Sequence, residues 1–211
     1  MALPIRMAVL LSGSGRTLQN FLDRARLGAM KAKVVKVISS RPDAYGLERA
    51  RTAGAPTAVV RRREFADEES FSRALTELID DCGPDLVALA GFMCYYRVPP
   101  HYVNRIMNIH PALLPLFGGR GFYGDRVHAA VLEHGCRISG CTVHFVDNVY
   151  DHGPIIVQRA VKVEESDDVH SLAERVFEQE LEAYPEAINL FAEGRLRVEG
   201  RRVRILPASA E

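Results

Sequence analysis

The chain lacks most of the features that mark secreted and membrane proteins. It has no tryptophan and only 4 cysteines among its 211 residues, and no two cysteines form a CxxC pair. Scattered thiols of this kind are typical of a reducing compartment, and they fit small buried hydrophobes better than a zinc site. No apolar run approaches the ~20 residues of a membrane span, and residues 1–6 are too short and too mixed for a signal peptide. We therefore expect a cytoplasmic protein with no metal and no membrane partner.

Net charge is also absent. The 27 Lys and Arg residues balance 27 Asp and Glu residues. Proteins that bind nucleic acid usually carry a basic face, so this balance argues against a nucleic-acid partner. A chain of 211 residues, 47% of them hydrophobic, can bury a core without disulfides or metal. One compact domain over residues 1–211 is the simplest expectation.

Segments with strand-like and helix-like hydrophobic spacing alternate through about residue 110. Apolar runs predict strands at residues 5–11, 34–38, 58–60 and 86–90. Helical spacing predicts helices over residues 18–25, 44–53 and about 67–82, the last with Asp67 as its N-cap. Strands that alternate with helices indicate an α/β fold with a doubly wound, mostly parallel sheet.

The pattern changes after residue 110. Residues 138–146 and 155–163 predict two strands, and the loop between them is too short for a helical crossover, so we expect an antiparallel pair. A long helix over residues 169–192 then closes the fold, with Ser166 or Asp167 as its N-cap and Gly194 as its end.

Residues 12–17 form a glycine turn between the first predicted strand and the first predicted helix. The N-terminus of a helix presents free backbone N–H groups to an anion, and glycines let the chain approach a phosphate closely. A dinucleotide site would need a third glycine at Leu18 and an acidic residue where Ser39–Arg41 stand. We therefore favour a monophosphate site over a dinucleotide site or a turn without a ligand.

Two polar residues stand together before a proline that ends a predicted strand. Asn108 and His110 are two residues apart, so strand periodicity turns both side chains to one face, at the end where open α/β sheets bind ligands. A hydrogen-bonded polar pair at a strand terminus explains the spacing equally well. Asp151, in a glycine-containing loop, is either an ordinary turn aspartate or a carboxylate that orients a catalytic histidine.

Glu180 falls on the apolar stripe of the predicted closing helix, four residues from both Val176 and Tyr184. A carboxylate there should be partly buried and would need a core cation or a ligand amine as its partner, and we favour the ligand. Among the histidines, His144 fits a hydrogen-bonded residue of the sheet, whereas His128 fits a core role and a site role equally.

Five segments together resemble a known family. In chain order they are Leu11–Gly15, Leu89–Met93, Asn108–Pro115, Thr142–Val146 and Asp151–Ile156. With Asp43–Ala50 and Gly194–Leu196 added, this ordered set runs over nearly the whole chain and resembles the phosphoribosylglycinamide formyltransferases, folate-dependent enzymes of de novo purine synthesis. The resemblance implies a single formyltransferase domain, with a nucleotide-binding half over residues 1–110 and a folate-binding, catalytic half over residues 111–211.

The resemblance also implies a reaction and the residues that carry it. The co-substrate 10-formyltetrahydrofolate would give its formyl group to the amine of 5-phosphoribosylglycinamide, in a small-molecule enzyme that is a monomer or homodimer. By position in the family's motifs, the catalytic residues are Asn108, His110 and Asp151. The residues that bind phosphoribosylglycinamide are Gly15, Arg16, Thr17 and Glu180. The residues that bind folate are Met93, Cys94, Tyr95, Tyr96 and Asn108.

The chain departs from the family pattern in three places. Glu68 stands where many relatives carry an arginine toward the folate glutamate tail, so the resemblance implies that contact only if Arg61, Arg62 or Arg63 takes its place. Cys94–Tyr96 replace an arginine followed by two aliphatic residues. The glycine-rich segment 118–124 is longer than in the shortest relatives, and its Arg120 is either a ligand contact or part of a flexible loop.

Three other functions weigh less. Hydrolysis of formyltetrahydrofolate would leave Gly15 and Glu180 without a purpose, and its enzymes usually carry an additional N-terminal domain. Formylation of methionyl-tRNA would need an extra domain and a basic surface. A non-catalytic binding protein on the same fold is possible because fold alone does not establish function, but it would not need the three catalytic residues.

Overall fold

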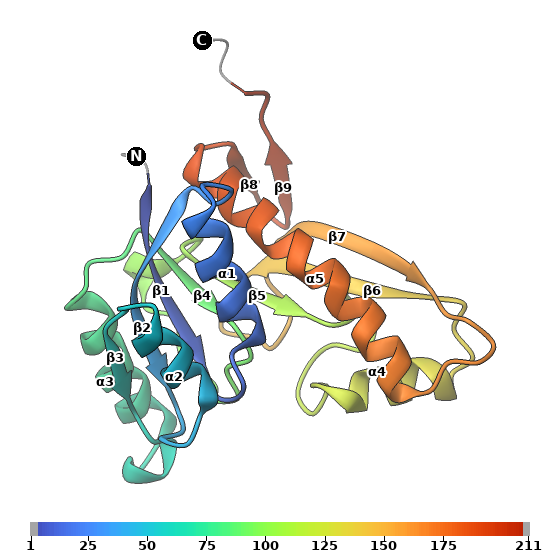
Figure 1. The fold of residues 1–211 in the computed structure, drawn as a ribbon, viewed down its shortest axis with the longest axis horizontal. Coiled ribbons are helices and arrows are strands. Elements are labelled where there is room, and N and C mark those ends of the chain that lie inside the picture. Colours follow the sequence, from blue (N-terminus) through green and yellow to red (C-terminus); the bar gives the residue numbers. More distant parts are fainter. Residues whose placement is uncertain (1–3, 209–211) are drawn as a thin grey trace. The chain divides into compact units, whose positions relative to one another are not determined.

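The computed structural model describes residues 4–208 and consists of two compact units, with the boundary between Met107 and Asn108. Figure 1 shows the elements of both units, coloured along the chain. One strand, β5 (Ile106–His110), runs across this boundary.

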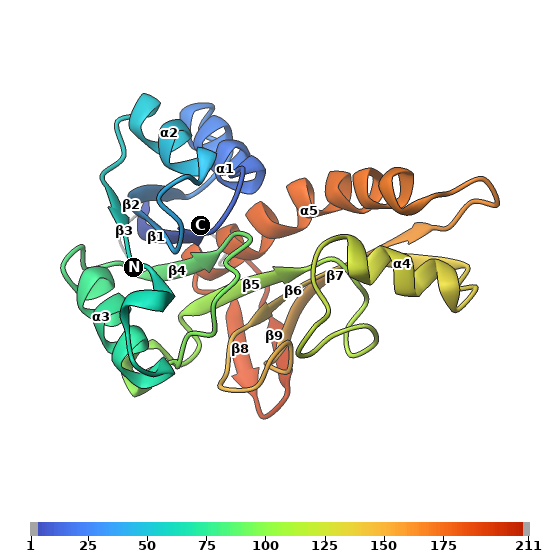
Figure 2. The same cartoon turned by 90° about the horizontal axis from the view of Figure 1, so that it is seen from below.

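The first unit contains a parallel sheet with the strand order β3-β2-β1-β4. Its strands are β1 (Ile5–Leu11), β2 (Ala32–Ser39), β3 (Thr57–Val59) and β4 (Leu86–Leu89). Its helices are α1 (Arg16–Arg26), α2 (Tyr45–Thr52) and α3 (Glu68–Asp80), with the short 3-10 turns η1 (Arg62–Glu64) and η2 (Pro100–Tyr102). Helices α1 and α2 lie on one face of the sheet and α3 on the other (Figure 2). The predicted doubly wound, parallel arrangement is confirmed.

Side chains from both helical layers fill the core of the first unit. Every residue of β4 is buried, as expected for a strand covered on both faces. Phe21 of α1 and Phe71 of α3 are fully buried, and each such side chain contributes about 1.5–3 kcal/mol by leaving water. Asp67 caps α3 as predicted, because its carboxylate accepts a hydrogen bond from the Ser70 N–H at 2.7 Å.

The second unit contains the predicted antiparallel pair, followed by a hairpin that the sequence analysis did not find. Val143 of β6 pairs with Val157 of β7 in an antiparallel register. The hairpin pairs antiparallel within itself and adjoins β7 through the parallel pair Ile155 and Arg202, which gives the order β6-β7-β9-β8. These strands are β6 (Ile138–Phe145), β7 (Ile155–Lys162), β8 (Leu196–Glu199) and β9 (Arg202–Ile205).

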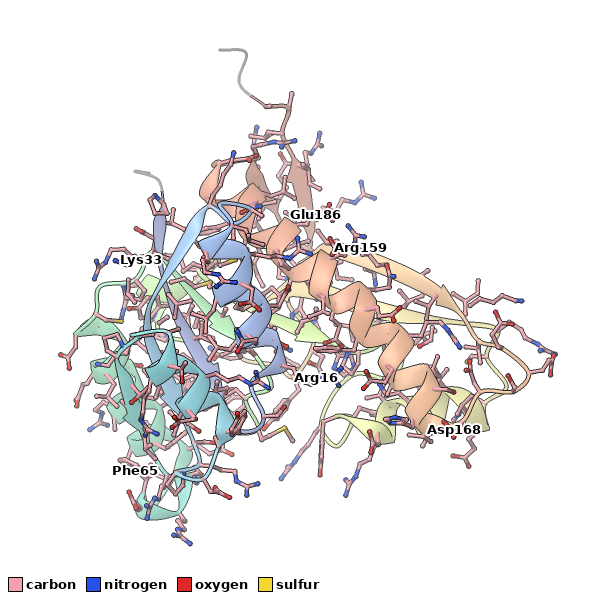
Figure 3. All side chains as sticks on the ribbon, viewed as in Figure 1. Arg16, Lys33, Phe65, Arg159, Asp168 and Glu186 are labelled. Carbon is pink, nitrogen blue, oxygen red and sulfur yellow. The ribbon has the colours of Figure 1, made fainter. Side chains whose placement is uncertain are left out.

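The second unit also contains two helices. They are α4 (Asp125–Glu133) and the long closing helix α5 (Val169–Ala192), which packs on β6, β7 and α4. On its outer side, Glu186 of α5 accepts an ion-pair hydrogen bond of 2.8 Å from Arg159 of β7 (Figure 3). Within residues 4–208, neither α5 nor any other helix is long and apolar enough to cross a membrane.

Helix α5 has the predicted bounds, but its N-cap is a different residue from the two that were predicted. The N-cap is Asp168, whose carboxylate accepts from the Ser171 N–H at 2.8 Å, rather than Ser166 or Asp167. Asp167 instead forms a two-bonded ion pair with Arg175, and this pair holds the pKa of the Asp167 carboxyl well below its usual range. Two adjacent aspartates have the same local capping chemistry, but the guanidinium of Arg175, almost two turns into α5, binds Asp167 and leaves Asp168 as the cap.

Candidate active site

Four polar side chains of the second unit meet in one cluster, the candidate cluster of Asn108, His110, His144 and Asp151. Asn108 and His110 project from β5, His144 projects from β6, and Asp151 comes from the loop between β6 and β7. His110 is 3% exposed and His144 is 2% exposed. The structure therefore brings together the three residues that the sequence analysis singled out, and it adds His144.

His144 occupies the centre of the candidate cluster. Its Nδ1 lies 2.8 Å from the Phe145 carbonyl oxygen, which can only accept, so Nδ1 carries the proton. Burial lowers the pKa of His144, although the Phe145 carbonyl and the nearby Asp151 oppose the shift. The neutral imidazole then offers its Nε2 lone pair to the Asn108 amide, whose Nδ2 lies 3.3 Å away. This contact fixes which end of the Asn108 side chain faces His144.

His110 is held at both of its ring nitrogens. Its Nε2 donates to the carbonyl oxygen of Phe117 at 2.8 Å. Its Nδ1 faces Oδ2 of Asp151 at 3.5 Å. Oδ1 of the same carboxylate lies 3.8 Å from Nε2 of His144, so Asp151 faces both imidazoles.

The loop that carries Asp151 has a constrained backbone. Asp151 adopts a φ of 52°, a left-handed conformation that costs an L-residue free energy unless its surroundings hold it. Oδ2 of Asp151 accepts a hydrogen bond of 2.9 Å from the Gly119 N–H. Two residues further on, a Cβ at Gly153 would lie 1.8 Å from the Phe145 carbonyl oxygen, so only glycine fits there.

The glycine-rich segment 118–124 takes part in this arrangement. A Cβ at Gly118 would lie 2.5 Å from a methyl carbon of Leu114 and 3.3 Å from Cβ of Asp151. Gly118 thus allows the segment to approach Asp151, and Gly119 supplies the N–H that binds its carboxylate. The side chain of Arg120 is exposed, and its role as a ligand contact stays a prediction.

Hydrogen bonds from the buried Thr142 and from Gln158 fix the chain directly after His110. Thr142 of β6 accepts from the Leu114 N–H at 3.0 Å and donates to the Ala112 carbonyl at 2.7 Å. Gln158 of β7 donates to the Leu114 carbonyl at 3.0 Å. Thr142 is fully buried whereas Gln158 is exposed, and together their hydrogen bonds hold the strand end that positions His110.

The predicted phosphate turn lies in the first unit, at the start of α1, where Figure 3 labels Arg16. Gly15 is the N-cap, has a φ of 71°, and makes no side-chain capping bond. A Cβ at Gly15 would lie 2.6 Å from Cα of Gly46 in α2, so this glycine also permits close packing of the turn on α2. Arg49 of α2 donates to the Ser14 carbonyl at 3.0 Å and braces the turn.

The predicted folate segment begins beside the same turn. The Met93 N–H donates to the Ser12 hydroxyl at 2.9 Å, and that hydroxyl lies 2.6 Å from the Ser40 hydroxyl. The Met93 side chain is largely exposed, whereas Tyr96 is buried and its hydroxyl lies 2.9 Å from that of Thr76. Burial raises the pKa of Tyr96 to about 12. Cys94 and Tyr95 are half-buried.

Glu180 and Glu68, the two glutamates with predicted or altered ligand roles, differ in burial. Glu180 is half-buried on α5, as predicted for an acid on the apolar stripe. Burial, and secondarily the charge of Glu180, raises the pKa of Cys141 on β6 to about 12. Glu68 is exposed at the start of α3. Of the arginines before it, Arg61 pairs with Glu64 at 3.3 Å.

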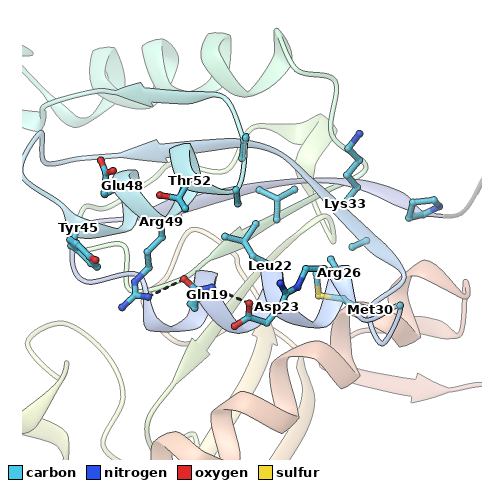
Figure 4. Close-up of a pocket in the computed structure, with 18 residues that line it drawn as sticks. Gln19, Leu22, Asp23, Arg26, Met30, Lys33, Tyr45, Glu48, Arg49 and Thr52 are labelled. Atoms are coloured by element: carbon cyan, nitrogen blue, oxygen red, sulfur yellow. Dashed lines mark hydrogen bonds between the residues drawn. The ribbon is translucent and has the colours of Figure 1, made fainter.

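One large cavity of the first unit lies apart from the residues predicted to bind ligands. It measures about 860 Å³ and lies between α1, α2 and the start of β2 (Figure 4). Gln19, Asp23 and Arg49 line its wall and are joined by hydrogen bonds of 2.9 Å and 3.1 Å. Gly15, Arg16 and Thr17 are not among the lining residues. Across residues 4–208, no three His, Cys, Asp or Glu side chains are grouped so as to hold a metal ion.

Comparisons with known proteins agree on one family. A sequence model described as formyl transferase matches residues 5–188. The phosphoribosylglycinamide formyltransferase of Escherichia coli is 39% identical over 196 residues, which cover 92% of this chain and 90% of that protein. The crystal structure of glycinamide ribonucleotide transformylase 1 from Symbiobacterium toebii is 50% identical, with a TM-score of 0.90, and the match covers 96% of this chain and 94% of that one.

Two further relatives show how widely the fold is used. The trifunctional purine biosynthetic protein adenosine-3 of Bos taurus is 39% identical over 92% of this chain, but the chain spans only 19% of that protein. A formyltetrahydrofolate deformylase from Pseudomonas syringae superposes with a TM-score of 0.85 at 22% identity, over 96% of this chain and 66% of that one. At that identity, the likeness to the deformylase concerns the fold alone.

Proposed function

This chain belongs to the formyl transferase family, and we propose that it transfers the formyl group of 10-formyltetrahydrofolate to the amine of 5-phosphoribosylglycinamide. The products are formylglycinamide ribonucleotide and tetrahydrofolate, in de novo purine biosynthesis. The Escherichia coli relative, which the chain matches over 90% of its length, bears the name of this activity. The observation that carries the proposal is the candidate cluster, where an amide, two imidazoles and a carboxylate meet in a buried place.

Asn108 stabilises the oxyanion that forms when the amine attacks the formyl carbon. An amide has two N–H bonds, and in Asn108 one of them is directed at Nε2 of His144. The second N–H is the one we assign to the oxyanion. Because the bond to His144 fixes the amide in advance, the donor needs no reorganisation as charge develops. Loss of such a donor typically costs about 3 to 4 kcal/mol of transition-state stabilisation.

His110 is the second oxyanion donor. Its Nδ1 faces Asp151, so the nitrogen that serves the substrate is Nε2, which exchanges the Phe117 carbonyl for the oxyanion. Asp151 stabilises the imidazolium form of His110 by its charge at 3.5 Å. The same carboxylate relays the proton of the attacking amine, through a bridging water, to N10 of the folate as the bond between N10 and the formyl carbon breaks, so that tetrahydrofolate leaves neutral.

The remaining assignments concern substrate binding. Gly15, Arg16 and Thr17 bind the phosphate at the N-terminus of α1, where backbone N–H groups and the helix dipole favour an anion. Glu180 holds the glycinamide amine. Residues 93–96, together with Asn108, contact the folate. The cytoplasmic location, the monomeric or homodimeric state, and the restriction to small-molecule partners stay predictions.

A single assay tests the proposed function. Purified protein is mixed with 10-formyltetrahydrofolate in the presence and absence of 5-phosphoribosylglycinamide, and tetrahydrofolate, formylated nucleotide and formate are measured. We expect tetrahydrofolate and formylated nucleotide to appear in equal amounts, only when the nucleotide is present. Release of formate without nucleotide would instead assign the chain to hydrolysis, and no turnover under either condition would leave a binding protein.

A further inference from the structure

An arginine on the C-terminal hairpin grips the loop that carries Asp151. Arg201 lies in the turn between β8 and β9, and its Nη2 donates to the backbone carbonyl oxygen of His152 at 2.8 Å. Its Nη1 lies 2.5 Å from Nε2 of the His152 side chain. Both terminal nitrogens of the guanidinium therefore bind His152, the residue directly after Asp151. Because the guanidinium is planar, two such bonds fix the orientation of His152 as well as its distance.

His152 in turn contacts Asp147 at the other end of the loop. Nδ1 of His152 donates to Oδ2 of Asp147 at 2.8 Å, and Oδ1 of Asp147 accepts from the Val149 N–H at 2.8 Å. The chain of contacts thus runs from Arg201 through His152 to Asp147, and Asp151 lies inside the loop that it closes. Because Nε2 of His152 receives the bond from Arg201, this geometry requires the neutral imidazole with its proton on Nδ1.

The loop needs such an anchor because Asp151 holds an unfavourable backbone conformation. Its φ of 52° persists only where surrounding contacts determine it. The carboxylate is held on the cluster side by the Gly119 N–H, and the backbone is held on the outer side by Arg201. The hairpin can serve as a fixed point because β9 pairs with the start of β7 through Arg202 and Ile155.

We infer that Arg201 is a positioning residue for Asp151, acting through His152. The inference rests on the proposed function, in which Asp151 stabilises the imidazolium of His110. It makes the β8–β9 hairpin part of the catalytic architecture although none of its side chains is assigned to a substrate. Loss of the fork should let Asp151 drift away from His110 without altering the residues assigned to phosphate or folate.

Three variants test the inference. Arg201→Ala removes both bonds to the loop. Arg201→Lys can restore only one of them, because an ammonium lacks the fork. Arg204→Ala is the matched control, since Arg204 lies on β9 of the same hairpin but donates to Glu199 and not to the loop. We expect Arg201→Ala to lower kcat by about 10-fold with the KM for the nucleotide unchanged, because small displacements of catalytic groups are costly. Arg201→Lys should lie between Arg201→Ala and the wild type, and Arg204→Ala should match the wild type.

Hydrogen exchange supplies a readout that does not depend on activity. Amides of residues 147–153 should exchange faster in Arg201→Ala than in the wild type or in Arg204→Ala, because the loop opens locally. Unchanged exchange of these residues in Arg201→Ala would overturn the inference. If the wild type is active, an unchanged kcat in Arg201→Ala would overturn it as well. The wild-type protein could lack formyl transfer while Arg201→Ala still speeds exchange in the loop. That result would refute the proposed function but would keep Arg201 as the anchor of Asp151.

Discussion

The candidate cluster of the second unit and the glycine turn of the first unit offer their chemistry in different ways. In the cluster, side chains hold one another, and each of the two buried imidazoles faces the carboxylate of Asp151. In the turn, the chain offers backbone at a helix N-terminus that has no side-chain cap, and a positive φ at Gly15 shapes it. Catalysis should therefore depend on side-chain identity in the cluster, whereas phosphate binding should depend on backbone conformation in the turn.

Removal of the His110 side chain should have the largest effect, and it tests whether catalysis depends on side-chain identity in the cluster. His110→Ala deletes a donor to the oxyanion, and we expect kcat to fall by roughly 10²- to 10³-fold with little change in the KM for the nucleotide. Steady-state kinetics of formyl transfer give both constants. His170→Ala, at an exposed histidine near the start of α5, is the control for a histidine outside the cluster. Near-normal turnover of His110→Ala would exclude His110 from the chemistry.

Glu180 sharpens the comparison because it is a side chain assigned to substrate binding. Glu180→Gln removes the charge proposed to hold the substrate amine, and a charge-assisted bond is worth about 1.5–3 kcal/mol, or roughly 10- to 100-fold in affinity. Titration should show weaker nucleotide binding with unchanged folate binding. Glu186→Gln is the control, since Glu186 lies on the same helix but pairs with Arg159 on the outer side. Equal losses for both ligands would refute the assigned role.

A substitution at Gly15 tests whether phosphate binding depends on the backbone conformation of the turn, and Gly28 supplies a matched control. Gly15 and Gly28 share a φ of 71°, but a Cβ would meet Gly46 only at Gly15, while Gly28 has open space around it. Gly15→Ala should therefore lower the free energy of unfolding by about 1–3 kcal/mol and also weaken nucleotide binding. Gly28→Ala should show the cost of the positive φ alone and bind the nucleotide normally. Denaturant unfolding and nucleotide titration measure the two effects, and identical behaviour of both variants would contradict the prediction.

The sequence predicted the first unit well because its signals are local. Continuous apolar strands, helical spacing and the capping aspartate at residue 67 each act within a few residues, and the structure confirms them. It predicted the C-terminal part less completely. The hairpin of β8 and β9 was missed, although the alternation over residues 196–205 around Gly200 is a hairpin signal. The hairpin is rich in charged residues and follows the closing helix, and both features obscured its strand pattern.

The candidate cluster was predicted only in part, for a physical reason. The spacing of Asn108 and His110 is a property of one strand, so sequence periodicity can find it. The contact of Asp151 with Gly119 and the grip of Arg201 on His152 join residues 32 and 49 positions apart, and no periodicity encodes them. His144 shows the limit most directly. It is a hydrogen-bonded residue of the sheet, as predicted, but its second ring nitrogen orients Asn108, and this appears only in three dimensions.

The neutral state of His144 yields the smallest expected effect, which is a change in the pH dependence of stability. Burial lowers the pKa of His144 in the folded protein, so the unfolded chain binds the proton more readily. The stability linked to this group is complete above the unfolded pKa of about 6.5 and is lost as the pH falls through the lower, folded value. Urea unfolding between about pH 7.5 and pH 5 should therefore show a declining free energy of unfolding.

Variants separate the sources of that decline. His144→Gln should flatten the slope whatever its effect on the absolute stability, because the slope counts only protons taken up on unfolding. His128 on α4 is also buried with a lowered pKa, so His128→Gln should remove a further part of the slope. An unchanged slope in His144→Gln would contradict the lowered pKa of His144, and a steeper slope would mean that the imidazole is already charged in the folded protein. Its Nε2 would then be a donor, and Asn108 would have to present its oxygen to His144, with both amide hydrogens left for the substrate.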